Sequence, residues 1–353
     1  MSEPKKMKLE EPQKALLYPV LPDELTEDTP LVSVYVDTIK EPKMTSKVVL
    51  SLNSLLPVPE LTHLKRINKR EVLLFPVSKE IAENCLEVHN YLERKGFDTN
   101  LVANKIRTVL VAKIPPKTKK QHCKVHALWP CNFHPDKYLE KLSTNTLFND
   151  RELDEHITYM RIAIEVAKKA NSVGLSQTQQ GVIVIDPKIK SVVAIGYSES
   201  THNPCKHAAM VAIDNVSKTQ NGGAWNDYTL DTSSSDLNLN GFHPKLLSHL
   251  QKLFSKTHFG ATVFRPKDQL TDPGDGPYLC TSYHVYSTFE VCVMCAMALV
   301  HSRVKRVFYG ASSDNGGLGT LCKIHTVRDL NHHYEVFGGL CESECEELNG
   351  GGC

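Results

Sequence analysis

Two short segments of the sequence combine histidine and cysteine at a spacing that suits a bound metal. Residues 204–210 read Pro-Cys-Lys-His-Ala-Ala-Met, and residues 290–296 read Glu-Val-Cys-Val-Met-Cys-Ala. Cys292 and Cys295 stand three apart at the expected start of a helix, so both sulfurs lie on one face, where the helix N-terminus favours thiolates. Together with His207 they offer one nitrogen and two sulfur ligands to tetrahedral zinc, and a fourth position is left for water or a substitute. The cysteine spacing alone also fits a redox pair or two buried small hydrophobes.

The residue two positions after His207 decides what such a site can do. Zinc-dependent base deaminases carry an H-x-E motif followed by P-C-x-x-C, and the glutamate moves protons between the zinc-bound water and the base. This chain has Ala209 at the glutamate position and Val291 where the motif has proline. Alanine neither accepts nor donates a proton, and one acid–base group typically contributes about 10²–10⁴-fold to the rate. The sequence therefore predicts negligible catalysis by this chain alone.

These segments carry a family resemblance. The stretch CVMCAMALVHSRVKRVFYG, with PCKHAAM and PYLCTSYHVY before it, resembles the tRNA-specific adenosine deaminases, and specifically the non-catalytic subunit of the eukaryotic wobble-adenosine deaminase heterodimer. The likeness covers residues 150–347 and implies a cytidine-deaminase-like α/β/α domain with one structural Zn²⁺, held by His207, Cys292 and Cys295. It also implies a catalytic partner subunit, conversion of adenosine to inosine at tRNA wobble position 34, and a location in the nucleus and cytoplasm.

Other groups near these motifs have simpler interpretations. Glu290 is expected to cap the following helix or to face solvent rather than to replace the missing acid, and Cys205 is expected to be structural. A second metal site at the C-terminus is disfavoured, because cysteines four apart on an end helix usually pack and Gly350–Gly352 indicate a mobile tail. The residues concerned are Cys341, Cys345 and Cys353, and the pair His332 and His333 is expected at the surface.

The elements that must position the metal ligands alternate between helix and strand. Apolar residues recur on one face of a long predicted helix over residues 150–170, which is typical of a helix packed on a sheet. Such alternation favours an α/β sandwich over residues 150–353. The predicted order is strands 181–186 and 191–196, a helix from Cys205, a flexible insertion over 219–276, a strand at 278–283, a helix over 292–302, a strand at 304–309 and a short terminal helix.

The first part of the chain predicts a different domain. Residues 1–30 contain 4 Lys/Arg, 7 Asp/Glu and five prolines, which indicates a flexible leader. Residues 31–114 then read β-α-β-β-α-β, the order of a ferredoxin-like α+β unit, and residues 115–149 are expected to form an ordered linker. The expected elements are strands 31–36, 63–67, 71–77 and 106–114 and helices 46–56 and 78–96.

Positive charge gathers in this first half. Residues 61–141 hold 16 Lys/Arg against 8 Asp/Glu, whereas residues 151–353 hold 18 against 21. Such clusters are often only solvated faces, but here aromatic residues lie nearby and the other half is slightly acidic, which favours contact with tRNA phosphates. The candidate RNA-binding residues are Lys65, Arg66, Lys69, Arg70, Lys113, Lys117, Lys119, Lys120 and Lys124.

Length and composition limit the number of domains and the classes of protein to which the chain can belong. A chain of 353 residues predicts about two domains, and 41% hydrophobic with 23% charged residues is enough to build a core. The net charge of +1 gives no bulk reason to bind nucleic acid. The eleven cysteines come without an export signal and are expected to be reduced, and no apolar run reaches the roughly 18 residues of a membrane span.

Two other functions remain open at this level. The chain could be an active zinc deaminase of nucleosides or RNA that recruits another acid, or a zinc-stabilised RNA-binding protein without an enzyme partner. Turnover by the single chain and co-purification with a deaminase subunit separate these from the non-catalytic subunit.

Overall fold

The computed structural model describes residues 17–78, 85–225, 237–263 and 278–348, and it divides the chain into two compact units. The N-terminal unit comprises residues 22–147, and the C-terminal unit comprises the segment before residue 22 together with the chain from Phe148 onward. Each unit has its own sheet and core.

The N-terminal unit is built on a four-stranded antiparallel sheet in the order β3 (Ile67–Asn68), β4 (Glu71–Pro76), β2 (Leu31–Thr38) and β5 (Arg107–Ala112). Helices α2 (Thr45–Leu55) and α3 (Cys85–Arg94) cover one face. Because successive side chains of a strand point to opposite faces, Tyr35 packs under these helices while Val34 and Val36 join a second cluster on the other face. The element order is the predicted β-α-β-β-α-β, although residues 79–84 of the predicted helix 78–96 lie outside the described residues.

The segment predicted as a linker is part of this unit. It forms α4 (Lys119–Leu128) and α5 (Lys137–Ser143), and Val125 and Trp129 complete the core on the second sheet face. The Trp129 indole N–H donates to the Lys65 carbonyl oxygen, 2.6 Å away. The N-terminal unit therefore extends to residue 147 rather than 114, because the sheet would otherwise leave an apolar face in water.

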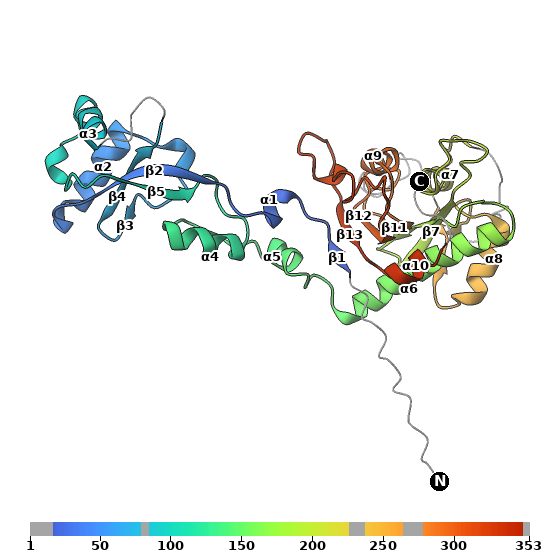
Figure 1. Ribbon diagram of the computed structural model, residues 1–353. Coiled ribbons are helices and arrows are strands. Elements are labelled where there is room, and N and C mark those ends of the chain that lie inside the picture. Colours follow the sequence, from blue (N-terminus) through green and yellow to red (C-terminus); the bar gives the residue numbers. More distant parts are fainter. Residues whose placement is uncertain (1–16, 79–84, 226–236, 264–277, 349–353) are drawn as a thin grey trace, which may run out of the picture. The chain divides into compact units, whose positions relative to one another are not determined.

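The C-terminal unit has the predicted α/β/α architecture. Its sheet runs in the order β1 (Tyr18–Pro19), β13 (Glu335–Gly338), β12 (Arg306–Ala311), β11 (His284–Phe289), β6 (Gly181–Asp186), β7 (Ser191–Tyr197) and β9 (His258–Phe259). Strands β11, β12 and β13 are parallel, and β6 is antiparallel to β11 and β7. Figure 1 shows α6 (Asp150–Ser172), α8 (Pro244–Leu253) and α10 (Glu342–Glu346) on one face, and α7 (Ala208–Thr219) and α9 (Val293–His301) on the other.

Two glycines let helices approach this sheet closely. A Cβ atom at Gly196 would lie 2.2 Å from the Ala208 carbonyl oxygen, and one at Gly181 would lie 2.1 Å from the Ala163 carbonyl oxygen. Any larger residue at either position would push α7 or α6 away from the sheet. Gly196 therefore fixes where the first turn of α7 lies.

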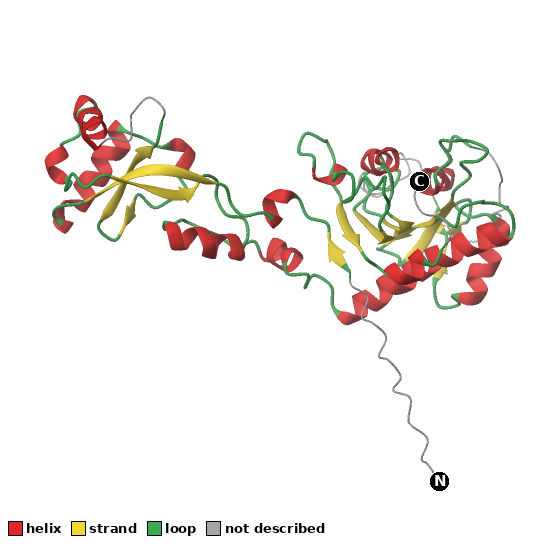
Figure 2. Ribbon diagram, viewed as in Figure 1, coloured by secondary structure: helices red, strands yellow, loops and turns green. Residues whose placement is uncertain are grey.

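Several predicted boundaries differ from the structure, whose helices and strands Figure 2 shows. The strand predicted at 63–67 is the short β3 at Ile67–Asn68, and the helix predicted from Cys205 begins at Ala208. Residues 278–283 form turns, with positive φ at Leu279 and Ser282, and the strand is His284–Phe289. Part of the predicted leader belongs to the C-terminal unit, because Tyr18 in β1 pairs with Gly338. Within the predicted flexible insertion 219–276, α8, β9 and the antiparallel pair β8 (Leu237–Asn238) and β10 (Ala261–Thr262) are ordered elements, whereas 226–236 and 264–277 lie outside the described residues.

None of the helices in the described parts of the chain has the length and apolar character needed to traverse a bilayer.

Candidate metal centre

Two helix N-termini bring the predicted ligands together. His207 is the N-cap residue of α7, Cys292 is the N-cap residue of α9, and Cys295 lies in the first turn of α9. The Nδ1 atom of His207 lies 3.5 Å from the Cys292 sulfur and 3.6 Å from the Cys295 sulfur. Residues 85 positions apart in the sequence thus converge on one point.

This geometry suits a tetrahedral zinc ion. Zinc bonds of about 2.0–2.1 Å to nitrogen and 2.3 Å to sulfur place neighbouring ligand atoms roughly 3.6 Å apart. Neither His207 nor Cys292 uses its side chain to cap its helix, so both side chains are directed to the shared point. The N-terminal ends of both helices also favour the thiolate forms that bind metal. We refer to His207, Cys292 and Cys295 as the metal centre.

Ala209 lies in the first turn of α7 with 2% of its surface exposed. A cavity of about 10 Å³ adjoins it, lined also by Val182, Ser287, Phe289 and Glu290. A single water needs about 10–15 Å³, so this cavity has no room for a nucleobase. The Ala209 side chain cannot supply the proton transfer that deamination requires.

Glu290 does not face solvent and does not cap α9, which corrects the sequence-based interpretation. Its side chain is fully buried and its carboxylate accepts hydrogen bonds from the loop over residues 313–320. Oε1 accepts from the backbone N–H groups of Leu318, at 2.9 Å, and Thr320, at 3.1 Å. A Cβ atom at Gly316 would collide with this carboxylate at 2.1 Å. Glu290 is therefore a positioning residue that fixes the 313–320 loop beside the start of α9.

Four of the remaining cysteine and histidine candidates take part in local packing or hydrogen bonding: Cys341, Cys345, His332 and His333. Cys345 is fully buried beneath Gly310, and burial raises the pKa of the Cys341 thiol to about 11. The rings of His332 and His333 bond to the carbonyl oxygens of Val304 and His325. Cys205 is exposed, and Cys353 lies outside the described residues.

The nine candidate RNA-binding residues differ in what already surrounds them. The Arg66 guanidinium donates to the carbonyl oxygens of Leu56 and Leu74, and burial lowers its pKa to about 10. Arg70 donates to the Lys40 carbonyl oxygen. Lys117 pairs with Glu24 and Lys124 pairs with Asp28. Five of the nine are exposed lysines for which the described residues provide no salt bridge: Lys65, Lys69, Lys113, Lys119 and Lys120.

Comparison with known proteins reveals full-length relatives. The chain is 33% identical over 344 residues to "Probable inactive tRNA-specific adenosine deaminase-like protein 3" of Danio rerio, covering 94% of this chain and 93% of the relative. It is 32% identical to the human protein of the same name, covering 96% of this chain and 93% of the relative. "tRNA-specific adenosine deaminase TAD3" of Arabidopsis thaliana is 25% identical, covering 90% and 94% of the two chains.

Residues 153–235 match the model of the cytidine and deoxycytidylate deaminase zinc-binding region. The match includes His207 and ends before Cys292. A solved structure from a study of A-to-I editing by tRNA:A34 deaminases is distantly similar, at 18% identity and a TM-score of 0.32, over 54% of this chain and 97% of the other.

Proposed function

Because the chain belongs to the family of inactive tRNA-specific adenosine deaminase-like protein 3, we propose that it is the non-catalytic subunit of a complex that converts adenosine to inosine at tRNA wobble position 34. One observation carries the proposal: the ligand set of a zinc deaminase is assembled, yet Ala209 occupies the position of the proton-transferring glutamate. A subunit of this kind needs a partner that supplies the carboxylate.

The metal centre has a structural role in this proposal. A zinc ion bound by His207, Cys292 and Cys295 would tie the first turn of α7 to the first turn of α9, which supports the fold without any catalytic step. In small zinc peptides such ligation contributes about 10–16 kcal/mol of apparent binding free energy. A ligand set can therefore remain useful after the catalytic residue is lost.

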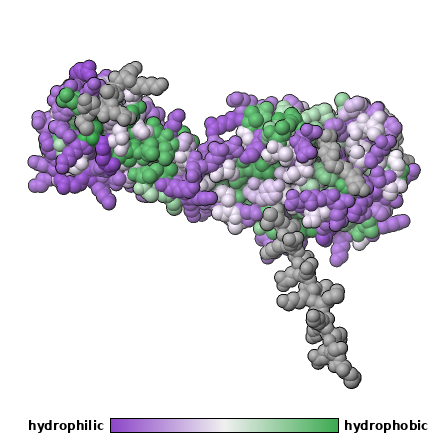
Figure 3. Space-filling model, in the orientation of Figure 1, coloured by the Kyte–Doolittle hydropathy of each residue, from purple (hydrophilic) through white to green (hydrophobic). Residues whose placement is uncertain are grey.

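A surface next to the metal centre supports docking of the catalytic subunit. Val293 and Met294 of α9 are 38% and 39% exposed, and Leu321 and Val327 on the neighbouring loop are 64% and 46% exposed. We call these four residues the α9 patch. Figure 3 shows apolar side chains gathered over this part of the C-terminal unit. Exposed apolar side chains that gather in this way are typical of protein–protein interfaces.

The five exposed lysines of the N-terminal unit support a role in tRNA binding. Lys119 and Lys120 lie in the first turn of α4, and Lys65, Lys69 and Lys113 lie on the loops and strand ends of the neighbouring sheet. Lysine ammonium groups release counterions when they contact phosphates, which supplies affinity without reading sequence. The N-terminal unit would thus hold the tRNA body while the catalytic partner acts on the wobble base.

Inosine formation tests the proposal directly. The purified chain, a glutamate-bearing deaminase subunit, and their stoichiometric mixture are each assayed on a tRNA anticodon arm with adenosine at the wobble position. We expect inosine from the mixture and none above background from the chain alone, because Ala209 transfers no proton. Met294→Glu in the α9 patch should lower the activity of the mixture by preventing assembly, whereas Leu50→Glu, at an exposed apolar residue of the other unit, should not.

Two outcomes would contradict the proposal. Turnover by the single chain that disappears with Cys295→Ala would identify an active zinc deaminase. A chain that binds tRNA but never co-purifies with a deaminase subunit would be a stand-alone RNA-binding protein.

A further inference from the structure

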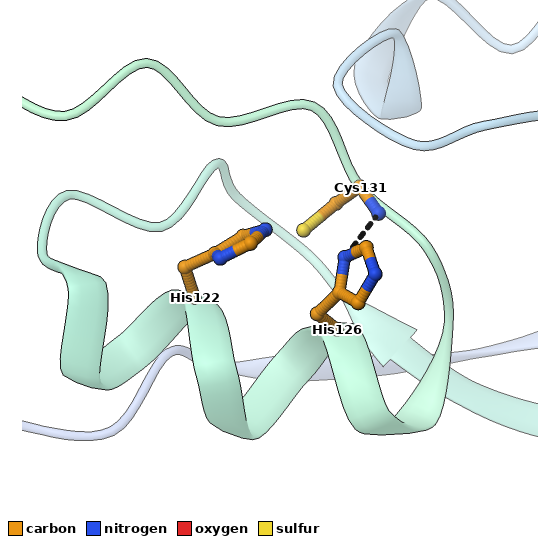
Figure 4. Close-up of side chains that lie close together, drawn as sticks. All are labelled: His122, His126 and Cys131. Atoms are coloured by element: carbon orange, nitrogen blue, oxygen red, sulfur yellow. Dashed lines mark hydrogen bonds between the residues drawn. The ribbon is translucent and has the colours of Figure 1, made fainter.

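A second group of metal-binding side chains lies in the N-terminal unit, far in sequence from the metal centre. His122 and His126 lie four residues apart on α4, and Cys131 follows the end of this helix. One ligand atom from each of the three residues lies within 4.8 Å of the other two. Figure 4 shows the His122 ring and the Cys131 sulfur directed toward each other, while the His126 Nδ1 atom accepts a hydrogen bond from the Cys131 backbone N–H at 3.5 Å. We call these residues the α4 cluster.

The backbone holds Cys131 in a fixed place. Cys131 is 4% exposed and forms an antiparallel bridge with Leu64. The residues on either side of Cys131 are hydrogen-bonded to the segment around Leu64. The Asn132 N–H donates to the His63 carbonyl oxygen at 2.7 Å, and the Lys65 N–H donates to the Pro130 carbonyl oxygen at 2.9 Å. The sulfur therefore needs no rearrangement of the chain to act as a ligand.

The helix and an aromatic ring orient the two histidines. Helix α4 begins with a capping box in which Thr118 and Gln121 bond reciprocally, and the Gln121 amide also donates to the Glu24 and Glu27 carbonyl oxygens. The His122 ring stacks on Phe133, with ring centres 4.7 Å apart and an interplanar angle of 15°. The hydrogen bond from the Cys131 N–H places the His126 ring beside this cysteine, and because His126 is exposed the ring can turn without disturbing the core.

The chemistry of this set favours zinc. Two imidazoles and one thiolate are ligands that zinc accepts in tetrahedral sites, and histidines four apart on a helix reach the same ion. The ligand atoms of the α4 cluster lie within 4.8 Å of one another, so they must approach by at most about 1.2 Å to reach the roughly 3.6 Å spacing of tetrahedral zinc. Rotation of the exposed His126 ring would contribute to that movement by exchanging its long 3.5 Å hydrogen bond from the Cys131 N–H for a bond to the metal, and water would complete the fourth position.

We propose that His122, His126 and Cys131 bind a Zn²⁺ ion that is separate from the metal centre. This ion joins α4 to the segment over residues 130–133 and so fixes the helix that carries Lys119, Lys120 and Lys124. The proposal does not depend on the proposed function, because it concerns a different unit of the chain and a different ligand set.

Zinc content of the full-length chain tests the second site. Elemental analysis after gel filtration should find one zinc equivalent fewer in His126→Gln than in the unmodified chain, with an unchanged circular dichroism spectrum because residue 126 is exposed. Cys123→Ser and His134→Gln are matched controls, since both residues are exposed nearby and neither belongs to the cluster. Both controls should keep the zinc content of the unmodified chain.

Cys292→Ser separates the two sites. Its zinc loss should add to that of His126→Gln in the double variant. Co²⁺ bound to a chain with both Cys292→Ser and Cys295→Ser, which leaves no thiolate at the metal centre, should still show thiolate-to-metal charge-transfer absorption, and this absorption should disappear on adding Cys131→Ser. Equal zinc content in His126→Gln and the unmodified chain, or a Cys292→Ser/Cys295→Ser chain without this absorption, would overturn the proposal.

Discussion

At the level of single residues, Ala209 and Glu290 show why the C-terminal unit has no carboxylate available for deamination. Ala209 has a methyl group where zinc deaminases carry a carboxylate. Glu290 has a buried carboxylate, which accepts hydrogen bonds from the 313–320 loop. Glu290 lies two residues before Cys292, but its hydrogen bonds engage the 313–320 loop and leave it no role as a substitute acid.

Glu290→Gln should lower the free energy of unfolding by about 2–3 kcal/mol, because buried hydrogen bonds to a charged group typically contribute that much. The variant keeps the size of the side chain and one acceptor oxygen for the Leu318 and Thr320 N–H groups, but it replaces Oε2 with an NH₂ donor that faces the Ser313 N–H and the Thr320 hydroxyl, both of which donate to Oε2. Urea unfolding measures the effect, with Glu346→Gln at an exposed position as the control. Equal stability of the two variants would show that the carboxylate does not hold the loop.

At the level of elements, the lysines in and just before α4 differ in whether their ammonium groups form a salt bridge; the Glu140 carboxylate beside Lys119 accepts from its backbone N–H and not from its ammonium group. Lys119 and Lys120 extend from the first turn of α4, whereas Lys124 pairs with Asp28, and Lys117 just before the helix pairs with Glu24. Exposed pairs of this kind add little stability, yet each places a carboxylate beside the lysine that a phosphate would have to displace.

Neutralising Lys119 and Lys120 together with glutamine should weaken tRNA binding and reduce the slope of log K against log salt concentration by about 1.4–1.8, because two phosphate contacts are lost. The matched variant, with Lys117 and Lys124 changed to glutamine, removes the same charge and should reduce the slope less. Binding of tRNA to the assembled complex across a salt series measures both. Identical slopes of log K against log salt concentration for the two variants would show that Lys119 and Lys120 of α4 do not contact the tRNA.

The predicted elements were most accurate where periodicity was long or a strand was fully buried. Helix α6 and strand β6 begin where the sequence predicted, because a capping box at Asn149 and a run of apolar residues mark these starts. The strand predicted at 278–283 was wrong, since positive φ angles at Leu279 and Ser282 are a property of the turn and not of the residue types. Sequence reasoning did not select His122 and His126, although their spacing of four on a helix was the available signal.

For the whole molecule, buried neutral histidines make the stability of the C-terminal unit depend on pH. Burial, with a smaller effect of Arg306, lowers the pKa of His156 to about 4 and that of His284 to about 3. Burial also lowers the pKa of His325 to about 4. His156 bonds to the buried Tyr286 hydroxyl at 2.7 Å, and His325 bonds to the Val20 carbonyl oxygen at 2.9 Å.

The C-terminal unit should therefore lose stability as the pH falls from about 6.5 toward 4. Above 6.5 both folded and unfolded chains hold these imidazoles neutral, whereas below it the unfolded chain binds protons that the folded chain excludes. Each histidine can remove up to about 1.4 kcal/mol per pH unit in this window. Urea unfolding across the range measures the slope, and His156→Gln should make it shallower. A free energy of unfolding that does not change across this window would contradict the burial of these rings.

The sequence by itself determined the ligand types, their helix-start positions and the missing carboxylate, because these are properties of residue identity and local spacing. It also determined the order of helices and strands along each unit in outline, since periodicity follows from which face of each element is buried. Only the tertiary structure decided that Glu290 is buried against a distant loop, that α4 completes the N-terminal unit, and that Cys131 meets two histidines. The physical reason is that burial and convergence depend on contacts between segments far apart in the chain, which no local pattern specifies.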